Sequence, residues 1–310
     1  PYLVAGDLAY IKGQVQAKRA LEIGASGGHN ILFIGQPGSG KTLLAKSYNT
    51  ILPAMQEKEI LESTQIYSVA GMLGNKQVIN TRPFRSPHHS SSHIALVGGG
   101  AKLRPGEVSL AHRGVLFLDE FPEFNRESIE ALRQPLEDGY ITISRASGTV
   151  KYPSRFYLLA AAKPTPSGYE AGAPDGSNTP QNHRAIVKYK AKFSGPILDR
   201  IDLQVEVNRP KKEELQSTNL AEGSIYVKQR VQKARDIQND RFKDLDIFTN
   251  SEMGLPEVEK FCKLNQDCKN LIDKSIDRFK MSARSYIKIL ILCRTIADLA
   301  GREKFIFLDI

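Results

Sequence analysis

Short apolar runs that end in glycine or in acidic residues mark the first two thirds of the chain. Ile31–Ile34 leads into Gly35, and Val115–Leu118 leads into two carboxylates. Phe156–Ala162 and Leu203–Val207 are runs of the same kind. Apolar runs without polar alternation are typical of strands that are buried on both faces of a parallel sheet. The pattern therefore predicts several buried parallel strands.

Helical spacing of the apolar positions follows two of these strands. Lys41–Leu52 has this spacing and stops before Pro53, and Glu127–Leu136 has it as well. Ile141–Ser144 and Thr149–Tyr152 flank a short turn that contains glycine, which indicates a hairpin. Strands that alternate with helices predict an α/β fold with a mainly parallel sheet flanked by helices.

The pattern changes after Val207. Lys211–Ile237 and Pro256–Ala300 are rich in charge and helical in spacing, and the stretch around residues 248–255 is typical of a loop. We therefore expect an α/β domain over residues 1–210 and a smaller all-helical domain over residues 211–310. A length of 310 residues with 41% hydrophobic content agrees with two domains.

Membrane, secretory and disulfide-based classes are disfavoured by the sequence. No apolar run approaches the ~20 residues that span a bilayer, and the first residues lack the basic start of a signal peptide. We expect a cytoplasmic protein without a membrane partner. Three cysteines, an odd and sparse number, are interpreted as packing residues: Cys262, Cys268 and Cys293.

The distribution of charge favours a polyanion partner. The formal net charge is +9, and three long segments contain no Asp or Glu but several Lys or Arg: 63–106, 139–169 and 176–198. Each segment alone is compatible with a solvated surface. Three such segments in one chain favour an electrostatic binding face.

A phosphate-binding loop follows the first predicted strand. Gly35-Gln36-Pro37-Gly38-Ser39-Gly40-Lys41-Thr42 fits the pattern G-x-x-x-x-G-K-[ST]. The glycines let backbone N–H groups approach phosphates closely, and the helix N-terminus adds positive charge. Lys41 is expected to contact the β- and γ-phosphates of ATP, and Thr42 to bind Mg²⁺. A strand before the loop and a helix after it are the context that this mechanism requires.

Asp119 and Glu120 form the expected second half of this site. They follow the Val115–Leu118 strand at its carboxyl end, where ligands bind in open α/β sheets. Asp119 is expected to hold Mg²⁺, and Glu120 to activate the attacking water as a general base. The sequence alone therefore predicts an ATPase that uses ATP and Mg²⁺.

Longer motifs resemble one family. The chain is similar to the ATPase module of ComM/YifB proteins, the magnesium-chelatase-like branch of AAA+ ATPases. The resemblance is carried by ordered stretches along nearly the whole chain: 7–14, 27–30, 82–89, 111–114, 133–139, 194–203, 282–284 and 294–299. It implies a P-loop AAA+ core with a helical lid, and a ring, usually a hexamer, with ATP at subunit interfaces. It also implies a Lon-protease-like domain before the ATPase, so we expect this chain to be part of a longer protein.

The resemblance assigns further residues. Arg200 would be an arginine finger that reaches a neighbour's γ-phosphate, although a salt bridge to Asp199 or Asp202 is an alternative on spacing. Arg284 would be the sensor arginine of the lid, or else an ordinary exposed cation. Insertions at about 72–106 and 140–153 would face the ring pore. Within these basic insertions, four residues are expected to contact DNA: Arg82, Arg85, Arg145 and Lys151.

Two departures from the family pattern concern the stretch after Ala162. The family has a cysteine-rich loop there, whereas this chain has Lys163–Gly168, with Ser177 and Thr179 near the second cysteine pair. Hydroxyls do not replace thiolates on zinc, so no zinc is expected. Lys163 also stands where the family has a sensor asparagine, and lysine offers charge but no acceptor.

Three functions compete at this point. The first is an ATP-driven DNA motor, as the resemblance to branch-migration helicases of natural transformation implies. The second is a chelatase-type or MoxR-like ATPase that remodels a protein partner. The third is an ATP-binding scaffold whose hydrolysis Lys163 impairs.

His88, His89 and His93 would suit a metal, but the family treats this stretch as structural or DNA-facing.

Overall fold

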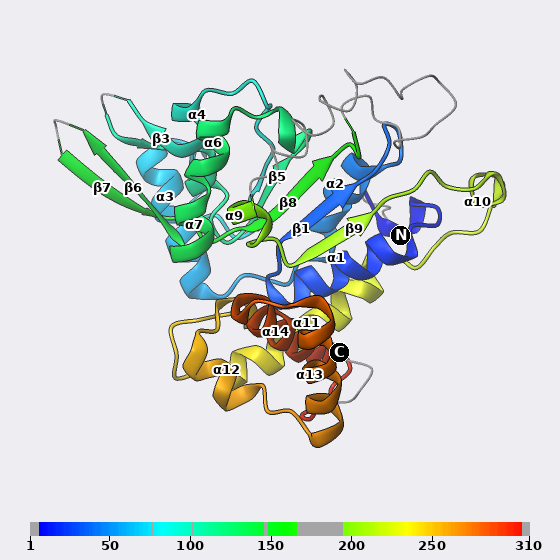
Figure 1. The fold of residues 1–310 in the computed structure, drawn as a ribbon. Coiled ribbons are helices and arrows are strands. Elements are labelled where there is room, and N and C mark those ends of the chain that lie inside the picture. Colours follow the sequence, from blue (N-terminus) through cyan, green and yellow to red (C-terminus); the bar gives the residue numbers. More distant parts are fainter. Residues whose placement is uncertain (1–5, 76, 101, 146–147, 166–194, 306–310) are drawn as a thin grey trace, which may run out of the picture.

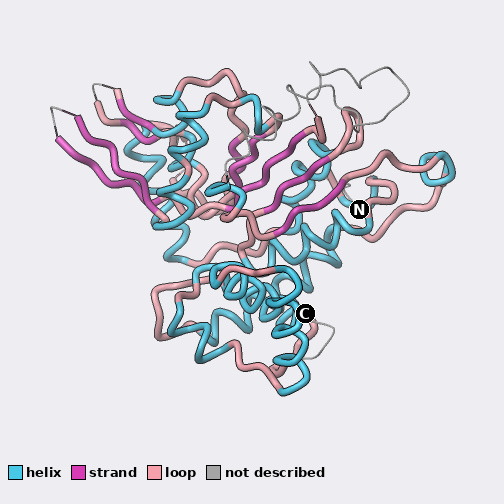
Figure 2. Tube along the Cα trace, in the orientation of Figure 1, coloured by secondary structure: helices cyan, strands magenta, loops and turns pink. Residues whose placement is uncertain are grey.

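The computed structural model describes residues 6–75, 77–100, 102–145, 148–165 and 195–305. A five-stranded sheet crosses the molecule, with helices on both sides and a helical C-terminal part beneath it (Figure 1). Figure 2 shows the same division, with strands confined to the upper part of the described chain. Of the loop in which we predicted no zinc, residues 163–165 are described, and the remainder lies outside the described residues.

The central sheet has the order β2-β5-β8-β1-β9, and all of its paired strands are parallel. Its strands are β1 (Ile31–Ile34), β2 (Phe84–Arg85), β5 (Val115–Leu118), β8 (Tyr157–Ala162) and β9 (Leu203–Glu206). β1 and β5 have the predicted bounds, and β5 and β8 are buried along their whole length. The predicted α/β fold with a parallel sheet is confirmed.

Alternate residues of each strand point to opposite faces of the sheet, and each face has its own apolar core. Phe33 and Phe117 pack against α1 (Val15–Gly27), α2 (Lys41–Ile51) and α11 (Ser224–Arg241). Leu32 and Leu116 pack on the other face. That face is covered by α4 (His93–Val97), α5 (Glu107–Leu110), α6 (Arg126–Ala131) and α9 (Gly195–Leu198).

The single helix predicted over Glu127–Leu136 is two helices, α6 and α7 (Arg133–Asp138). Pro135 is the reason: it has no N–H to donate to Ala131, and its ring crowds that carbonyl. The predicted hairpin forms from β6 (Tyr140–Arg145) and β7 (Gly148–Pro153), which pair antiparallel and project from one end of the molecule (Figure 1). The first predicted insertion follows α3 (Glu57–Ala70) and contains β2, α4 and the short pair β3 (Gly98–Gly99) and β4 (Arg104–Pro105).

The C-terminal part is helical, as predicted. Residues 211–305 contain α10 (Lys212–Gln216), α11, α12 (Leu255–Phe261), α13 (Gln266–Phe279) and α14 (Ala283–Leu299). Of these, α10 lies beside the sheet and apart from the helices beneath it (Figure 1). Short 3-10 helices lie at η1 (Leu8–Tyr10), η2 (Phe121–Glu123) and η3 (Asn250–Glu252). A third apolar core joins α12, α13 and α14, and all three cysteines are buried in it.

Helix α11 belongs to both parts of the molecule. Val227 and Val231 are buried in the core beneath the sheet, against α1 and α2. Near the other end of the helix, Gln238 accepts a hydrogen bond from the N–H of Asn250, and Arg241 pairs with Asp298 on α14. The predicted domain boundary at residue 210 stays a prediction. No helix of the described chain is long and apolar enough to cross a bilayer.

Candidate active site

The loop 35–40 joins the end of β1 to the start of α2. Gly38 and Gly40 have φ angles of 77° and 96°, a region in which side chains are strained. Gly35 lies close to the neighbouring strand end, because a Cβ there would be 2.2 Å from the carbonyl oxygen of Val207. The loop therefore needs its glycines, and it ends at the N-terminus of a helix, where backbone N–H groups favour anions.

Lys41 points back into this loop. Its Nζ donates hydrogen bonds to the carbonyl oxygens of Gly35 and Gln36, at 2.7 and 2.8 Å. Burial lowers the pKa of Lys41, while the charge of Asp119 acts in the opposite direction. The amine is thus held where the loop would wrap a polyphosphate.

Thr42 and Asp119 fit a magnesium site. The Thr42 hydroxyl donates to Asp119 Oδ2 at 2.9 Å, so two hard oxygen ligands from different elements converge on one point. Asp119 also accepts a hydrogen bond from the N–H of Glu120, which fixes its orientation. A hydroxyl, a carboxylate and adjacent phosphate oxygens are the donor set that Mg²⁺ uses in phosphoryl-transfer sites.

Glu120 lies beside the phosphate loop, and its two carboxylate oxygens face a lysine and a histidine. Lys163 Nζ donates to Glu120 Oε1 at 2.7 Å, and His89 Nδ1 lies 3.4 Å from Oε2. The hydrogen bond from Lys163 is the main reason that the pKa of Glu120 is lowered, and the charges of Lys163 and His89 add to it. Sequence reasoning placed Lys163 near this site, but it missed the contact of His89 with the carboxylate.

These residues line one cavity at the carboxyl ends of the strands. The cavity has a volume of about 650 Å³, and its walls come from the phosphate loop, from Asp119 and Glu120, from 161–163 and from 86–89. The structure thus brings together the phosphate loop, Asp119 and Glu120, as predicted. Arg200 and Arg284, the other two residues predicted to act on ATP, lie elsewhere. No group of three metal-binding side chains occurs among the described residues, His88 and His89 included.

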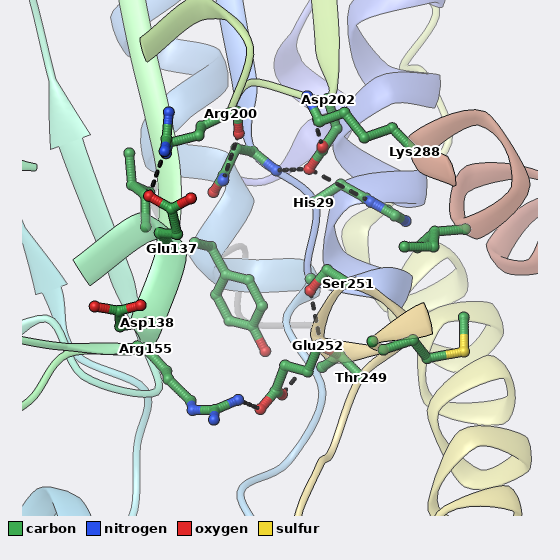
Figure 3. A pocket seen from close by; sticks show the side chains of 18 of the residues that line it. His29, Glu137, Asp138, Arg155, Arg200, Asp202, Thr249, Ser251, Glu252 and Lys288 are labelled. Carbon is green, nitrogen blue, oxygen red and sulfur yellow. Dashed lines mark hydrogen bonds and ion pairs between the residues drawn. The ribbon is translucent and has the colours of Figure 1, made fainter. Parts of the chain in front are cut away.

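Arg200 and Arg284 line a second cavity, of about 850 Å³, between the sheet and the C-terminal helices (Figure 3). Asn30, Tyr157 and Asp202 also line it, and each lies at the amino end of its strand. The Arg200 guanidinium pairs with Glu137 of α7, while Asp202 pairs with Lys288 and lies near His29. The salt bridge that spacing suggested for Arg200 therefore forms with a residue distant in sequence.

Arg82 does not face solvent. Only 6% of the Arg82 surface is exposed. Its guanidinium pairs with the buried Glu59 at 2.8 Å and donates to the carbonyl oxygens of Pro53 and Arg113. A guanidinium enclosed in this way has no surface for a DNA phosphate. We therefore correct the prediction that Arg82 contacts DNA: it joins α3 to the sheet.

The other predicted DNA contacts are placed differently. Arg85 is half-buried and forms two hydrogen bonds of 2.6 Å with Glu107, which neutralises its charge locally. Lys151 is exposed on β7, and its Nζ lies 3.2 Å from the centre of the Tyr140 ring. Arg145 ends β6 at the tip of the hairpin, and its side chain lies outside the described part of the structure.

Comparisons with known proteins agree with this geometry. A family model described as magnesium chelatase, subunit ChlI, matches residues 7–215, and the model of its C-terminal region matches residues 221–306. The chain is 44% identical over 299 residues to competence protein ComM of Haemophilus influenzae, covering 96% of this chain and 57% of that protein. It is also 44% identical over 294 residues to YifB of Escherichia coli, covering 94% of this chain and 56% of that protein.

A more distant similarity concerns a replication protein. DNA replication licensing factor mcm5 of Dictyostelium discoideum is 29% identical over 184 residues, which are 59% of this chain and 20% of that protein. The chain spans a little over half the length of the ComM and YifB relatives, 57% and 56%.

Proposed function

This chain belongs to the magnesium chelatase ChlI family of AAA+ ATPases, and on that premise we propose that it is the ATP-hydrolysing motor of a cytoplasmic ring that acts on DNA. Each ATP would bind in the cavity at Gly35–Thr42 of one subunit. Arg200 and Arg284 of the neighbouring subunit would complete that site, so that hydrolysis requires the assembled ring.

The position of Arg200 relative to the phosphate loop carries this proposal. β1 and β9 are parallel neighbours, with Ile31 paired to Leu203 and Ile34 to Glu206. The phosphate loop follows the carboxyl end of β1, whereas Arg200 precedes the amino end of β9. The two therefore lie at opposite ends of these parallel strands. A strand of four residues separates these two ends by about 13 Å, which is further than an arginine side chain extends. Arg200 therefore serves the ATP of a second copy, where it would stabilise charge on the transferring phosphoryl group.

Arg284 supports the same arrangement. It lies in the first turn of α14 and lines the cavity that Arg200 lines, away from the phosphate loop of its own chain. Two arginines from different parts of the chain thus line one cavity between the sheet and the C-terminal helices. A neighbour's triphosphate, with its high negative charge, is the ligand that such a pair would recognise.

The residues of the phosphate cavity have distinct tasks in the proposed reaction. Lys41 and the loop N–H groups bind and orient the phosphates, and Thr42 and Asp119 would hold Mg²⁺, which neutralises phosphate charge when bound. Glu120 accepts a proton from the attacking water, which requires that its carboxylate face the water and not Lys163 alone.

Three observations favour DNA as the substrate. The hairpin β6–β7 projects from the molecule and carries the exposed Lys151 in a segment without acidic residues. The relatives include a protein named for competence and, more distantly, one named for DNA replication. The formal net charge of +9 is the third, because positive charge suits binding along a phosphate backbone.

A protein-remodelling ATPase remains the second candidate, because the family model is that of a chelatase subunit. DNA-stimulated hydrolysis separates the two. We expect single-stranded or branched DNA to raise ATP turnover of the chain, and added salt to remove that stimulation. Turnover that does not respond to any DNA structure at low salt would favour a protein partner.

Mixed assemblies test the shared site. Lys41→Ala and Arg200→Ala subunits are each expected to be inactive alone, with turnover reduced on the order of 10³-fold for Arg200→Ala. Mixing them creates interfaces that join an intact phosphate loop to an intact Arg200, so activity should return in part. Mixed assemblies that stay inactive would exclude action of Arg200 between subunits.

A further inference from the structure

The loop that carries Arg200 is held from two sides, and one side is the C-terminal helical part. From the sheet, the Asn30 side chain donates to the carbonyl oxygen of Arg200 at 2.9 Å and accepts from the N–H of Leu158 at 3.0 Å. The N–H of Asn30 also donates to Asp202 at 3.0 Å. The carbonyl oxygen of Asn30 accepts from the N–H of Asp202 at 3.0 Å, so Asn30 fixes the backbone on both sides of Ile201.

Lys288 holds the same loop from α14. Its Nζ donates to the carbonyl oxygen of Ile201 at 2.9 Å and lies 3.3 Å from Asp202 Oδ1. Figure 3 shows Lys288 reaching from its helix toward Asp202, in the wall of the cavity that Arg200 lines. One ammonium therefore contacts both residues that follow Arg200.

A second contact between α14 and this loop runs through His29. Its Nε2 lies 2.7 Å from Thr295 Oγ1 of α14, and its Nδ1 lies 3.6 Å from Asp202 Oδ2. His29 and Thr295 are buried, with residue exposures of 1% and 0%. Burial alone would raise the pKa of Asp202, but the hydrogen bond from His29 and the charge of Lys288 lower it, which keeps the carboxylate ionised.

Helix geometry places Lys288 and Arg284 together. They are four residues apart on α14, and residues with this spacing share one helix face. Both line the cavity that Arg200 lines. A movement of α14 would therefore displace Arg284 directly, and it would displace Arg200 through the grip of Lys288 on Ile201 and Asp202.

We propose that Lys288 is a positioning residue for Arg200, which couples the C-terminal helices of one subunit to ATP hydrolysis in the next. The inference rests on the proposed sharing of the site between subunits. The side chain of Lys288 touches neither nucleotide nor water in this scheme. It sets where the backbone of residues 200–202 lies, and so where the Arg200 guanidinium is presented.

The test uses mixed assemblies in which only one kind of interface is productive. Lys41→Ala subunits donate Arg200, and Arg200→Ala subunits accept it at an intact phosphate loop. Lys288→Met placed in the donor should lower the recovered turnover on the order of ten- to a hundredfold, because small displacements of a catalytic group are costly. The same change placed in the acceptor should leave the recovered turnover close to that of the parent mixture, since that subunit donates no arginine.

Matched variants separate positioning from folding. Lys288→Arg keeps a cation and N–H donors, so it should restore much of the donor activity. Lys274→Met changes an exposed lysine of α13, and in the donor it should have no effect. Asp202→Asn removes the carboxylate that Lys288 faces at constant size, and it should act in the donor alone. The thermal unfolding midpoint of each variant, and its ATP affinity measured in a subunit that keeps Lys41, show that the subunit is folded.

Two results would overturn the inference while leaving the shared site intact. The first is a donor Lys288→Met mixture as active as the parent mixture. The second is an equal loss from donor and acceptor positions, which would indicate a general effect on assembly. If the mixture of Lys41→Ala and Arg200→Ala subunits recovers no turnover, the proposed sharing of the site between subunits is excluded. The role of Lys288 is then excluded with it.

Discussion

Lys163 and Glu120 form an ion pair in the phosphate cavity, with 2.7 Å between Nζ and Oε1. The lysine comes from the residue after β8, and the carboxylate from the residue after Asp119. His89 approaches the other carboxylate oxygen from the segment after β2. The group proposed to activate water is therefore held by the Lys163 ammonium at one oxygen and faces the His89 imidazole with the other.

Lys163→Asn should raise ATP turnover, because it frees Glu120 and supplies an amide that can orient water. We expect an increase of roughly tenfold, which is less than the roughly 10²–10⁴-fold that a positioned general base contributes in full. Steady-state hydrolysis with DNA present measures it, and Lys163→Arg, which keeps the ion pair, is the control. Adding Glu120→Gln should abolish the gain, since the two residues act through one contact. A slower Lys163→Asn variant would mean that the lysine assists hydrolysis.

Lys41→Ala and Glu120→Gln should fail at different steps. Loss of Lys41 removes the charge that the loop holds for the phosphates, so ATP binding itself should be abolished. Glu120→Gln keeps the size of the side chain and loses the base, so ATP should bind and stay unhydrolysed. Equilibrium binding of a fluorescent ATP analogue and single-turnover hydrolysis measure the two steps. Parental hydrolysis by Glu120→Gln would show that another group activates the water.

Arg82→Ala should destabilise the fold and leave the DNA affinity of the folded protein unchanged. Removing the guanidinium leaves the carboxylate of Glu59 buried without its partner, which costs about 3–5 kcal/mol of unfolding free energy for a buried pair. Urea unfolding measures the change, and Lys151→Ala, an exposed site, should shift it by less than about 0.5 kcal/mol. Weaker DNA binding at unchanged stability would restore Arg82 to the DNA path.

Replacing Arg145 and Lys151 together with alanine should weaken DNA binding and flatten its dependence on salt. Each lost phosphate contact should reduce the slope of log affinity against log salt by about 0.7 for single strands and 0.9 for duplex. Lys269 and Lys274, two exposed lysines of α13, provide the matched double variant. ATP turnover without DNA should change little. An unaltered slope would take the β6–β7 hairpin out of the DNA path.

Local features of this fold follow from the sequence because they depend on neighbouring residues. The first and last residues of β1 and β5 were predicted correctly, because glycine or acidic residues mark where each buried apolar run ends. The phosphate loop and Asp119 followed from spacing, because a strand, a glycine loop and a helix must occur in that order. The break at Leu132 was missed, although Pro135 gave the signal for it.

Contacts between distant residues were not predictable in the same way. Arg82 and Glu59 belong to different elements, and an arginine in a basic segment gives no sign that it is buried. Arg200 pairs with Glu137, a residue distant in sequence, because the end of α7 meets the turn after α9 only in the folded chain. His29 and Asn30 were noted within a motif but were given no role. A polar pair directly before a buried strand was the available signal.

Helix α11 gives the two parts of the molecule a common mechanical element. Its 18 residues form a rod of about 27 Å, buried at one end beneath the sheet and bonded at the other to η3 and α14. Because α11 packs directly against α2, a shift of α2, which begins at Lys41, would displace α11 as well. A shift of α2 on nucleotide binding would therefore reach the C-terminal helices through a stiff helix and not through a flexible linker.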